Sequence, residues 1–262
     1  MAIAAPGPFA DRKNLEKAVI HKTAWLACLV LAAHVAVADD VERTKQGATQ
    51  SGVFCATQDE KRCQSAVTPR QVLERLKAGN ERFANGYMTA RNFDEQVKAT
   101  AAGQFPLASI VSCIDSRAPA EILFDQGIGD LFNARVAGNI INDDILGSLE
   151  FASKVAGARL VVVLGHTSCG AIKGACDDVQ LGHLTGLLAR IMPAVKAVET
   201  RDADRSSKNY AFVEKVAERN VRLGVQEIRD TSPILREMED KGEIMIVGAM
   251  YDVASGKVTW YE

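Results

Sequence analysis

Two cysteines and one histidine have the residue types and the spacing of a metal site. Cys113 ends the apolar run 107–113, His166 ends the apolar run 159–166, and Cys169 follows three positions later. Ligands of open parallel sheets bind outside the carboxyl ends of the strands, so these three side chains could meet there. Two thiolates and one imidazole suit Zn²⁺, and a site with three protein ligands keeps its fourth position free for catalysis.

A carboxylate and a guanidinium follow Cys113 at short range. Asp115 and Arg117 are two positions apart, so continued extended backbone would point both side chains the same way. A two-pronged hydrogen bond from an arginine can hold a carboxylate ionised and oriented. Such a pair also occurs as an ordinary structural ion pair. Beside a metal it indicates that the carboxylate either orients a group bound to the metal or binds the metal itself under some conditions.

Cys176 and His183 could in principle supply the fourth ligand that a structural zinc site requires. Cys176 lies seven residues after Cys169 within an apparent helix, where we expect a packed thiol. His183 stands at a helix start, where we expect a surface or interface residue. The pattern therefore favours a catalytic site with three protein ligands.

Strand patterns alternate with helix patterns along the part of the chain that carries these residues. This alternation predicts an α/β fold, with a mainly parallel β-sheet flanked by helices on both faces. The continuous apolar run before His166 is typical of a parallel strand covered on both sides. We find no internal repeat and no linker, so a single catalytic domain is expected over residues 69–262. The predicted strands are 107–113, 130–136, 159–166, 243–253 and a terminal hairpin strand at 257–262. The first predicted helix begins at Pro69 after the N-cap Thr68, and the second covers 142–157 with Asn142 as its N-cap. Further helices are predicted over 180–199, 208–229 and 232–241.

The first 38 residues are typical of a cleaved export signal. Basic residues precede an uncharged stretch over 23–38, whose 16 residues fall short of the roughly 20 that a membrane-spanning helix needs. The stretch closes with Ala36-Val37-Ala38, the small-x-small pattern of a signal-peptidase site, and a buried or interfacial helix is the alternative. We therefore expect a signal peptide over 1–38, an N-terminal arm over 39–68 and export to the periplasm, or a cytoplasmic protein if the segment is no functional signal.

Cys55 and Cys63 flank a short polar stretch of the expected arm. In an oxidising compartment these two cysteines could form a local disulfide, and two unpaired thiols are the alternative. The disulfide would close a short loop and constrain the unfolded chain only modestly.

The charges of the chain are nearly balanced, with 31 Lys and Arg against 33 Asp and Glu. A nucleic-acid-binding protein would show a basic excess or a basic stripe, and the sequence has neither. We therefore expect a small-molecule substrate, no nucleic-acid partner, and no membrane association once the signal is removed. The sequence also lacks a phosphate-binding loop and a Cys-x-x-Cys redox motif.

Three motifs occur in the order that is found in one enzyme family. They are CIDSR at 113–117, ARVAGN at 134–139 and GHTSCGA at 165–171. With these motifs the chain resembles the β-class carbonic anhydrases, and the resemblance extends from residue 76 to residue 258. It implies zinc-dependent reversible hydration of carbon dioxide to bicarbonate and a proton, by attack of zinc-bound hydroxide. It also implies homodimers or dimers of dimers, with the active site at the subunit interface.

The resemblance also implies roles for individual residues. Asp115 and Arg117 would form the catalytic dyad. Gln104 would hydrogen-bond the substrate, as in the readily open subtype, and the backbone amide of Gly170 would face the substrate. One Zn²⁺ per subunit would be bound by Cys113, His166 and Cys169.

Two alternative functions remain open at this point. A relative that hydrolyses carbon disulfide or carbonyl sulfide could use the same zinc site, because pocket shape and access decide the substrate. A non-catalytic zinc protein is the other alternative, although a structural zinc needs neither an open fourth position nor the pair of Asp115 and Arg117.

Overall fold

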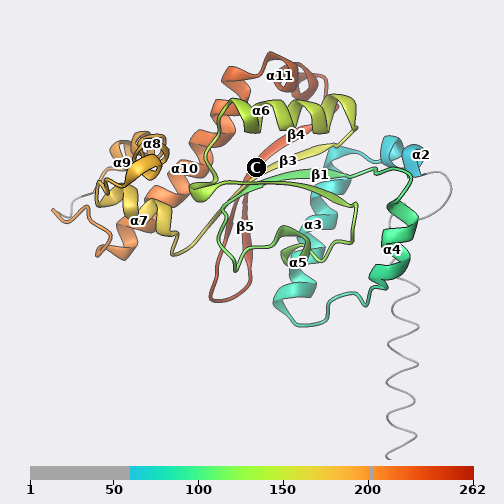
Figure 1. Cartoon of the computed structure of the whole chain (residues 1–262), viewed down its shortest axis with the longest axis horizontal. Helices are drawn as coiled ribbons and strands as arrows, with labels where there is room; N and C mark the ends of the chain where they lie inside the picture. Colours follow the sequence, from blue (N-terminus) through green and yellow to red (C-terminus); the bar gives the residue numbers. More distant parts are fainter. Residues whose placement is uncertain (1–59, 201–202) are drawn as a thin grey trace, which may run out of the picture. The chain divides into compact units, whose positions relative to one another are not determined.

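The computed structural model describes residues 60–200 and 203–262, and its centre is a five-stranded sheet (Figure 1). The strand order is β2-β1-β3-β4-β5, in which the first four strands are parallel and the last is antiparallel to β4. The strands are β1 (Ala108–Ser112), β2 (Leu131–Arg135), β3 (Leu160–His166), β4 (Met245–Tyr251) and β5 (Val258–Tyr261). The predicted mainly parallel sheet and its terminal hairpin are confirmed.

Helices precede and connect the strands. The longer ones are α3 (Pro69–Ala84), α4 (Phe93–Thr100), α6 (Asp143–Glu150), α8 (Gly182–Ala189), α10 (Tyr210–Thr231) and α11 (Pro233–Asp240). The shorter ones are α2 (Glu60–Ala66), α5 (Ala120–Leu123), α7 (Gly170–Cys176), α9 (Met192–Ala197), the 3₁₀ turn η1 (Ala137–Asn139) and the π-helical turn η2 (Phe151–Val155). Over the described residues, every helix is too short or too polar to cross a membrane.

The helices cover both faces of the sheet, as predicted, because successive side chains of a strand point to opposite faces. Val161 and Val163 of β3 pack into a core with residues of α6, α10 and α11. Leu160, Val162 and Leu164 pack into a second core with residues of α3 and α5. Figure 1 shows α6 and α11 on one side of the sheet and α3 and α5 on the other. A strand buried on both sides is therefore apolar at every position.

Two helices begin at the predicted N-caps. The side chain of Thr68 accepts a hydrogen bond from the backbone N–H of Gln71, and the side chain of Gln71 accepts one from the backbone N–H of Thr68, which forms a capping box before α3. The side chain of Asn142 accepts a hydrogen bond from the backbone N–H of Ile145 at the start of α6. These local signals explain why the sequence predicted both starts correctly.

The N-terminal arm expected over 39–68 is helical in its last part. Gln64 of α2 is buried, and its side-chain amide donates hydrogen bonds of 2.8 Å to the carbonyls of Pro106 and Ala156. Val67 is buried in the same core as α3. The sequence missed this helix because contacts with distant residues stabilise it. The expected signal segment 1–38 lies outside the described residues.

The order of the strands creates the place for a site. After β1 the chain moves to one side of that strand to form β2, and it returns on the other side to form β3. At such a reversal a crevice opens outside the carboxyl ends of the two neighbouring strands, and ligands of open α/β sheets bind there. Cys113 directly follows β1 and His166 ends β3, so both residues lie at this crevice.

Candidate metal centre

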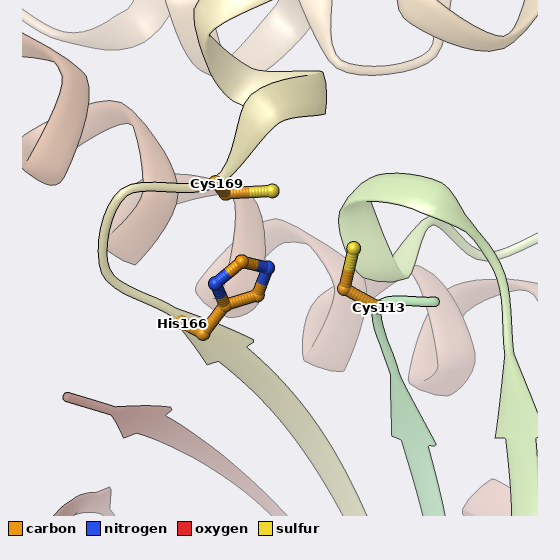
Figure 2. A group of neighbouring side chains, drawn as sticks. All are labelled: Cys113, His166 and Cys169. Carbon is orange, nitrogen blue, oxygen red and sulfur yellow. The ribbon is translucent and has the colours of Figure 1, made fainter. Parts of the chain in front are cut away.

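The three predicted ligands converge at the carboxyl ends of β1 and β3. The ligand atoms of Cys113, His166 and Cys169 all lie within 4.8 Å of one another, and all three residues are buried. Figure 2 shows the two sulfur atoms and the imidazole edge directed toward a common space. In a tetrahedral zinc site with Zn–S bonds of about 2.3 Å the sulfur atoms are about 3.8 Å apart, so small side-chain shifts would complete the coordination.

The hydrogen bonding of His166 supports metal binding by its Nε2 atom. Nδ1 lies 2.9 Å from the carbonyl oxygen of Thr167 and donates its proton to it. This contact makes Nε2 the nitrogen with the free lone pair. Nε2 is buried and has no hydrogen-bond partner among the described residues. Since buried polar atoms are almost always paired, this unpaired nitrogen fits a ligand of a metal ion, held in orientation by the bond on the other side of the ring.

The two thiols differ in their proton affinity. The hydrogen bond from the Cys169 thiol, together with the one from the backbone N–H of Gly138, lowers the pKa of Cys113 to about 4. The neighbouring Cys113 sulfur and burial raise the pKa of Cys169. Without a cation the pair therefore retains one proton, whereas a divalent cation stabilises both thiolates and releases it. This donor set fits Zn²⁺.

Asp115 and Arg117 form the predicted pair beside this cluster. Nε and Nη2 of Arg117 donate hydrogen bonds of 2.9 and 2.8 Å to the two carboxylate oxygens of Asp115. A third hydrogen bond of 2.9 Å comes from the backbone N–H of Arg117, so a tight turn, and not extended backbone, brings the two side chains together. These bonds hold the pKa of Asp115 well below its usual range. Its Oδ2 lies 3.8 Å from Nε2 of His166, next to the ligand space.

Two further residues hold the loops around Cys113, and motif reasoning had not assigned them. The guanidinium of Arg135 donates hydrogen bonds of 3.0 Å to the carbonyl of Cys113 and 2.6 Å to that of Asp115. The side-chain amide of Asn220 donates a hydrogen bond of 2.9 Å to the carbonyl of Gly138, whose N–H lies 3.4 Å from the Cys113 sulfur. Arg135 lies within the ARVAGN motif, which could have indicated it, but no local signal indicates Asn220.

Gly170 and Gln104 lie in different places relative to the cluster. Gly170 directly follows Cys169 at the start of α7, so its backbone is beside the site. Gln104 is exposed and precedes β1, whereas Cys113 follows that strand. Five strand residues span about 16 Å, so the Gln104 side chain does not reach the cluster of its own subunit.

The remaining predicted cysteine and histidine roles concern residues away from the cluster. Cys176 is partly buried against the core, and burial raises its pKa to about 11. His183 is exposed at the start of α8. Cys63 is disulfide-bonded, whereas its expected partner Cys55 lies outside the described residues, so this pairing stays a prediction.

Known proteins with related sequences share one activity in their names. The family model described as carbonic anhydrase matches residues 108–258. Carbonic anhydrase 2 of Mycobacterium tuberculosis is 36% identical over 198 residues, which cover 73% of this chain and 92% of that protein. The carbonic anhydrase of Mycolicibacterium smegmatis is 34% identical over 190 residues, which cover 70% of this chain and 88% of that protein.

Solved structures agree with the sequence relatives. The β-carbonic anhydrase CafA of Aspergillus fumigatus superposes with a TM-score of 0.55 at 26% identity and covers 74% of this chain and 90% of its own. The two tetrameric β-carbonic anhydrases of Sordaria macrospora include a chain with a TM-score of 0.55 at 22% identity, covering 73% of this chain and 94% of its own.

A mainly parallel sheet with a Cys-His-Cys cluster at the carboxyl ends of β1 and β3 defines, over the described residues, an α/β protein with a candidate metal centre. The matches in sequence and in fold add the family. The chain belongs to the β-carbonic anhydrases and is an enzyme of that class, whose reaction is the hydration of carbon dioxide.

Proposed function

We propose that this protein catalyses the zinc-dependent, reversible hydration of carbon dioxide to bicarbonate and a proton. The observation that carries the proposal is the buried, unpaired Nε2 of His166 facing two cysteine sulfurs within 4.8 Å. Zinc, when bound, supplies the Lewis acidity that makes water a nucleophile near neutral pH. Three protein ligands leave one position of such an ion for solvent.

The side chains around the cluster have separate tasks in this reaction. Cys113, Cys169 and Nε2 of His166 would hold the ion when it is bound. The carboxylate of Asp115 can accept a hydrogen bond from the attacking water and direct its lone pair toward carbon dioxide. Arg117 keeps this carboxylate ionised and engaged through two side-chain hydrogen bonds, which also hold it off the ion.

The charge of the ligand set affects the acidity of the water. Two thiolates cancel the charge of Zn²⁺, so on charge alone water is less acidified here than in a site with neutral imidazole ligands. The N–H of Gly138 donates to the Cys113 sulfur at 3.4 Å and withdraws part of its negative charge. Asn220 donates a hydrogen bond to the carbonyl of Gly138 and so helps to hold this residue in place. The loop thus offsets part of the thiolate effect.

We infer that the working form is a homodimer or a dimer of dimers. The side chain of Gln104 is at the far end of β1 from Cys113, so its expected contact with substrate requires a second copy of the chain. Near the edge strand β2, Phe151 is 52% exposed and packs its ring against Phe132, and Val155 is 72% exposed. Exposed apolar side chains of this kind mark interfaces. The Sordaria macrospora relatives are described as tetrameric.

The expected assembly can be measured by sedimentation velocity. The wild-type protein should sediment as a dimer or tetramer, and Phe151→Glu should shift it toward the monomer, because a carboxylate would be buried at the interface. A wild-type protein that sediments only as a monomer would contradict the inference.

We further propose that the enzyme acts outside the cytoplasm after removal of residues 1–38. The mass and N-terminal sequence of the protein from periplasmic extracts should show cleavage after Ala38. A protein that keeps Met1 and stays in the cytoplasmic fraction would refute export but not the enzymatic proposal.

The reaction itself is tested by zinc analysis together with stopped-flow hydration of carbon dioxide. We expect one zinc per subunit and hydration that requires it, with removal of zinc by a chelator abolishing activity and added zinc restoring it. A zinc-loaded protein that releases sulfide from carbon disulfide or carbonyl sulfide faster than it hydrates carbon dioxide would contradict the proposed substrate. A zinc-loaded protein without either activity would be a structural zinc protein.

A further inference from the structure

The turn between His166 and Cys169 has an unusual backbone at its centre. Ser168 has a φ of +57°, in the left-handed region that residues with a side chain rarely adopt. This conformation costs of the order of 1 kcal/mol or more and persists where surrounding contacts hold it. Because two metal ligands flank this turn, whatever stabilises Ser168 also sets the distance between them.

Two residues in the first turns of α10 contact Ser168. A carboxylate oxygen of Glu214 accepts a hydrogen bond of 2.9 Å from the backbone N–H of Ser168. The hydroxyl of Tyr210 lies 3.2 Å from the Ser168 hydroxyl. A hydrogen bond to an ionised acceptor is about twice as strong as a neutral one, so the bond to Glu214 is the stronger support. Neither residue belongs to a motif that carries the family resemblance.

The sheet holds α10 in position for this contact. Val221 of α10 packs over Gly165 of β3 and Gly248 of β4, where a Cβ atom would lie 2.6 and 2.8 Å from its methyl groups. The two glycines thus let the helix approach the sheet more closely than side chains would allow. Glu214 lies two turns of helix before Val221, so the same packing fixes its position beside the turn.

We propose that Glu214 is a positioning residue for the metal centre. Its carboxylate binds the Ser168 amide, holds the turn in its strained form, and thereby keeps Nε2 of His166 and Sγ of Cys169 at the spacing that Zn²⁺ requires. This inference rests on the proposed zinc-dependent function. Loss of a partner outside the ligand set typically lowers metal affinity 10- to 100-fold, and we expect an effect in this range.

The test compares three variants of the full chain by titration of zinc against a competing chromogenic chelator. Glu214→Ala removes the acceptor and should weaken zinc binding 10- to 100-fold. Glu214→Gln keeps a neutral acceptor oxygen and should lose less. Glu218→Ala is the matched control, because Glu218 lies one turn further along α10 and pairs only with the exposed Arg222 among the contacts described. The control should bind zinc like the wild type.

A second readout separates positioning from general stability. In cobalt-substituted protein the visible bands of the Glu214 variants should shift, since they report ligand geometry, whereas those of Glu218→Ala should not. Equal zinc affinity and equal cobalt spectra for the Glu214 and Glu218 variants would overturn the proposal. If Glu214→Ala does not fold, Glu214→Gln decides in the same way. A wild-type protein that binds no zinc would refute the proposed function, whereas tight binding by both wild type and Glu214 variants would refute only the positioning role.

Discussion

Replacement of Arg117 by alanine is the most direct test of how Asp115 works. Arg117 provides the two side-chain hydrogen bonds to the Asp115 carboxylate, at 2.9 and 2.8 Å, and the variant keeps only the backbone N–H bond. The released carboxylate already has an oxygen 3.8 Å from Nε2 of His166, so it can turn toward the open position of the metal site. It would then compete with the water that must react.

The size of the effect follows from the number of bonds lost. Loss of one such partner typically lowers activity 10- to 100-fold, and the alanine variant loses two of the three donors to Asp115, so we expect a loss near 100-fold in kcat/KM. Arg117→Lys keeps the positive charge but not the two-pronged hydrogen bond, so its kcat/KM should lie between those of Arg117→Ala and the wild type. Stopped-flow hydration of carbon dioxide across the pH range measures these differences.

The control for Arg117→Ala is Arg70→Ala. The side chain of Arg70 is similarly exposed, at 56% against 50% for Arg117. It pairs with Glu74 on α3 and with Glu262 at the C-terminus, away from the metal cluster. Its removal should leave hydration unchanged. If Arg117→Ala hydrates carbon dioxide at near-normal rates throughout the pH range while it retains full zinc, the argument about Asp115 is wrong.

Two further substitutions test the ligand set and the fold around it. Cys113→Ser replaces a thiolate by a poorly ionised hydroxyl and should lose most of the zinc, while Cys176→Ser, outside the cluster, should keep one zinc per subunit; metal analysis that finds full zinc in both would refute the ligand assignment. Asp125→Asn breaks the ion pairs of a fully buried carboxylate with Arg82 and Arg91 and should lower the free energy of unfolding by about 3 kcal/mol, seen as a lower thermal midpoint. Hydrogen bonds from these arginines and from Thr89 lower the pKa of Asp125, so its contribution to the free energy of unfolding is present above the ordinary pKa of 3.8 and is lost as the pH falls below it. A variant whose acid unfolding matches that of the wild type in full would contradict this role of Asp125.

Several features could be predicted because the residues that determine them are close together in the sequence. The capping residues Thr68 and Asn142 bind backbone groups three positions away, and both helix starts were predicted correctly. The run before His166 is apolar at every position because helices cover both faces of β3, and that pattern predicted a parallel strand. The turn after Cys113 was harder, since alternation would bring Asp115 and Arg117 together only if the extended backbone continued, whereas a hydrogen-bonded turn joins them.

Other features depend on contacts between residues far apart in the chain. The α2 helix lies in a polar segment, and Gln64 ties it to carbonyls 42 and 92 positions away. Glu214 lies 46 positions from Ser168, and Asn220 lies 82 positions from Gly138. No periodicity or spacing near these residues distinguishes them from other polar residues of an amphipathic helix.

By itself the sequence indicated the three candidate donor residues, the α/β class and the order of the strands along the chain, because residue type and local periodicity encode these properties. Only the tertiary structure decided that β1 and β3 lie side by side, which brings Cys113 within ligand distance of residues more than fifty positions away. It also decided that α10 contacts the turn between His166 and Cys169. The physical reason is that strand pairing and helix packing are set by the burial of whole faces, a property that no single segment contains.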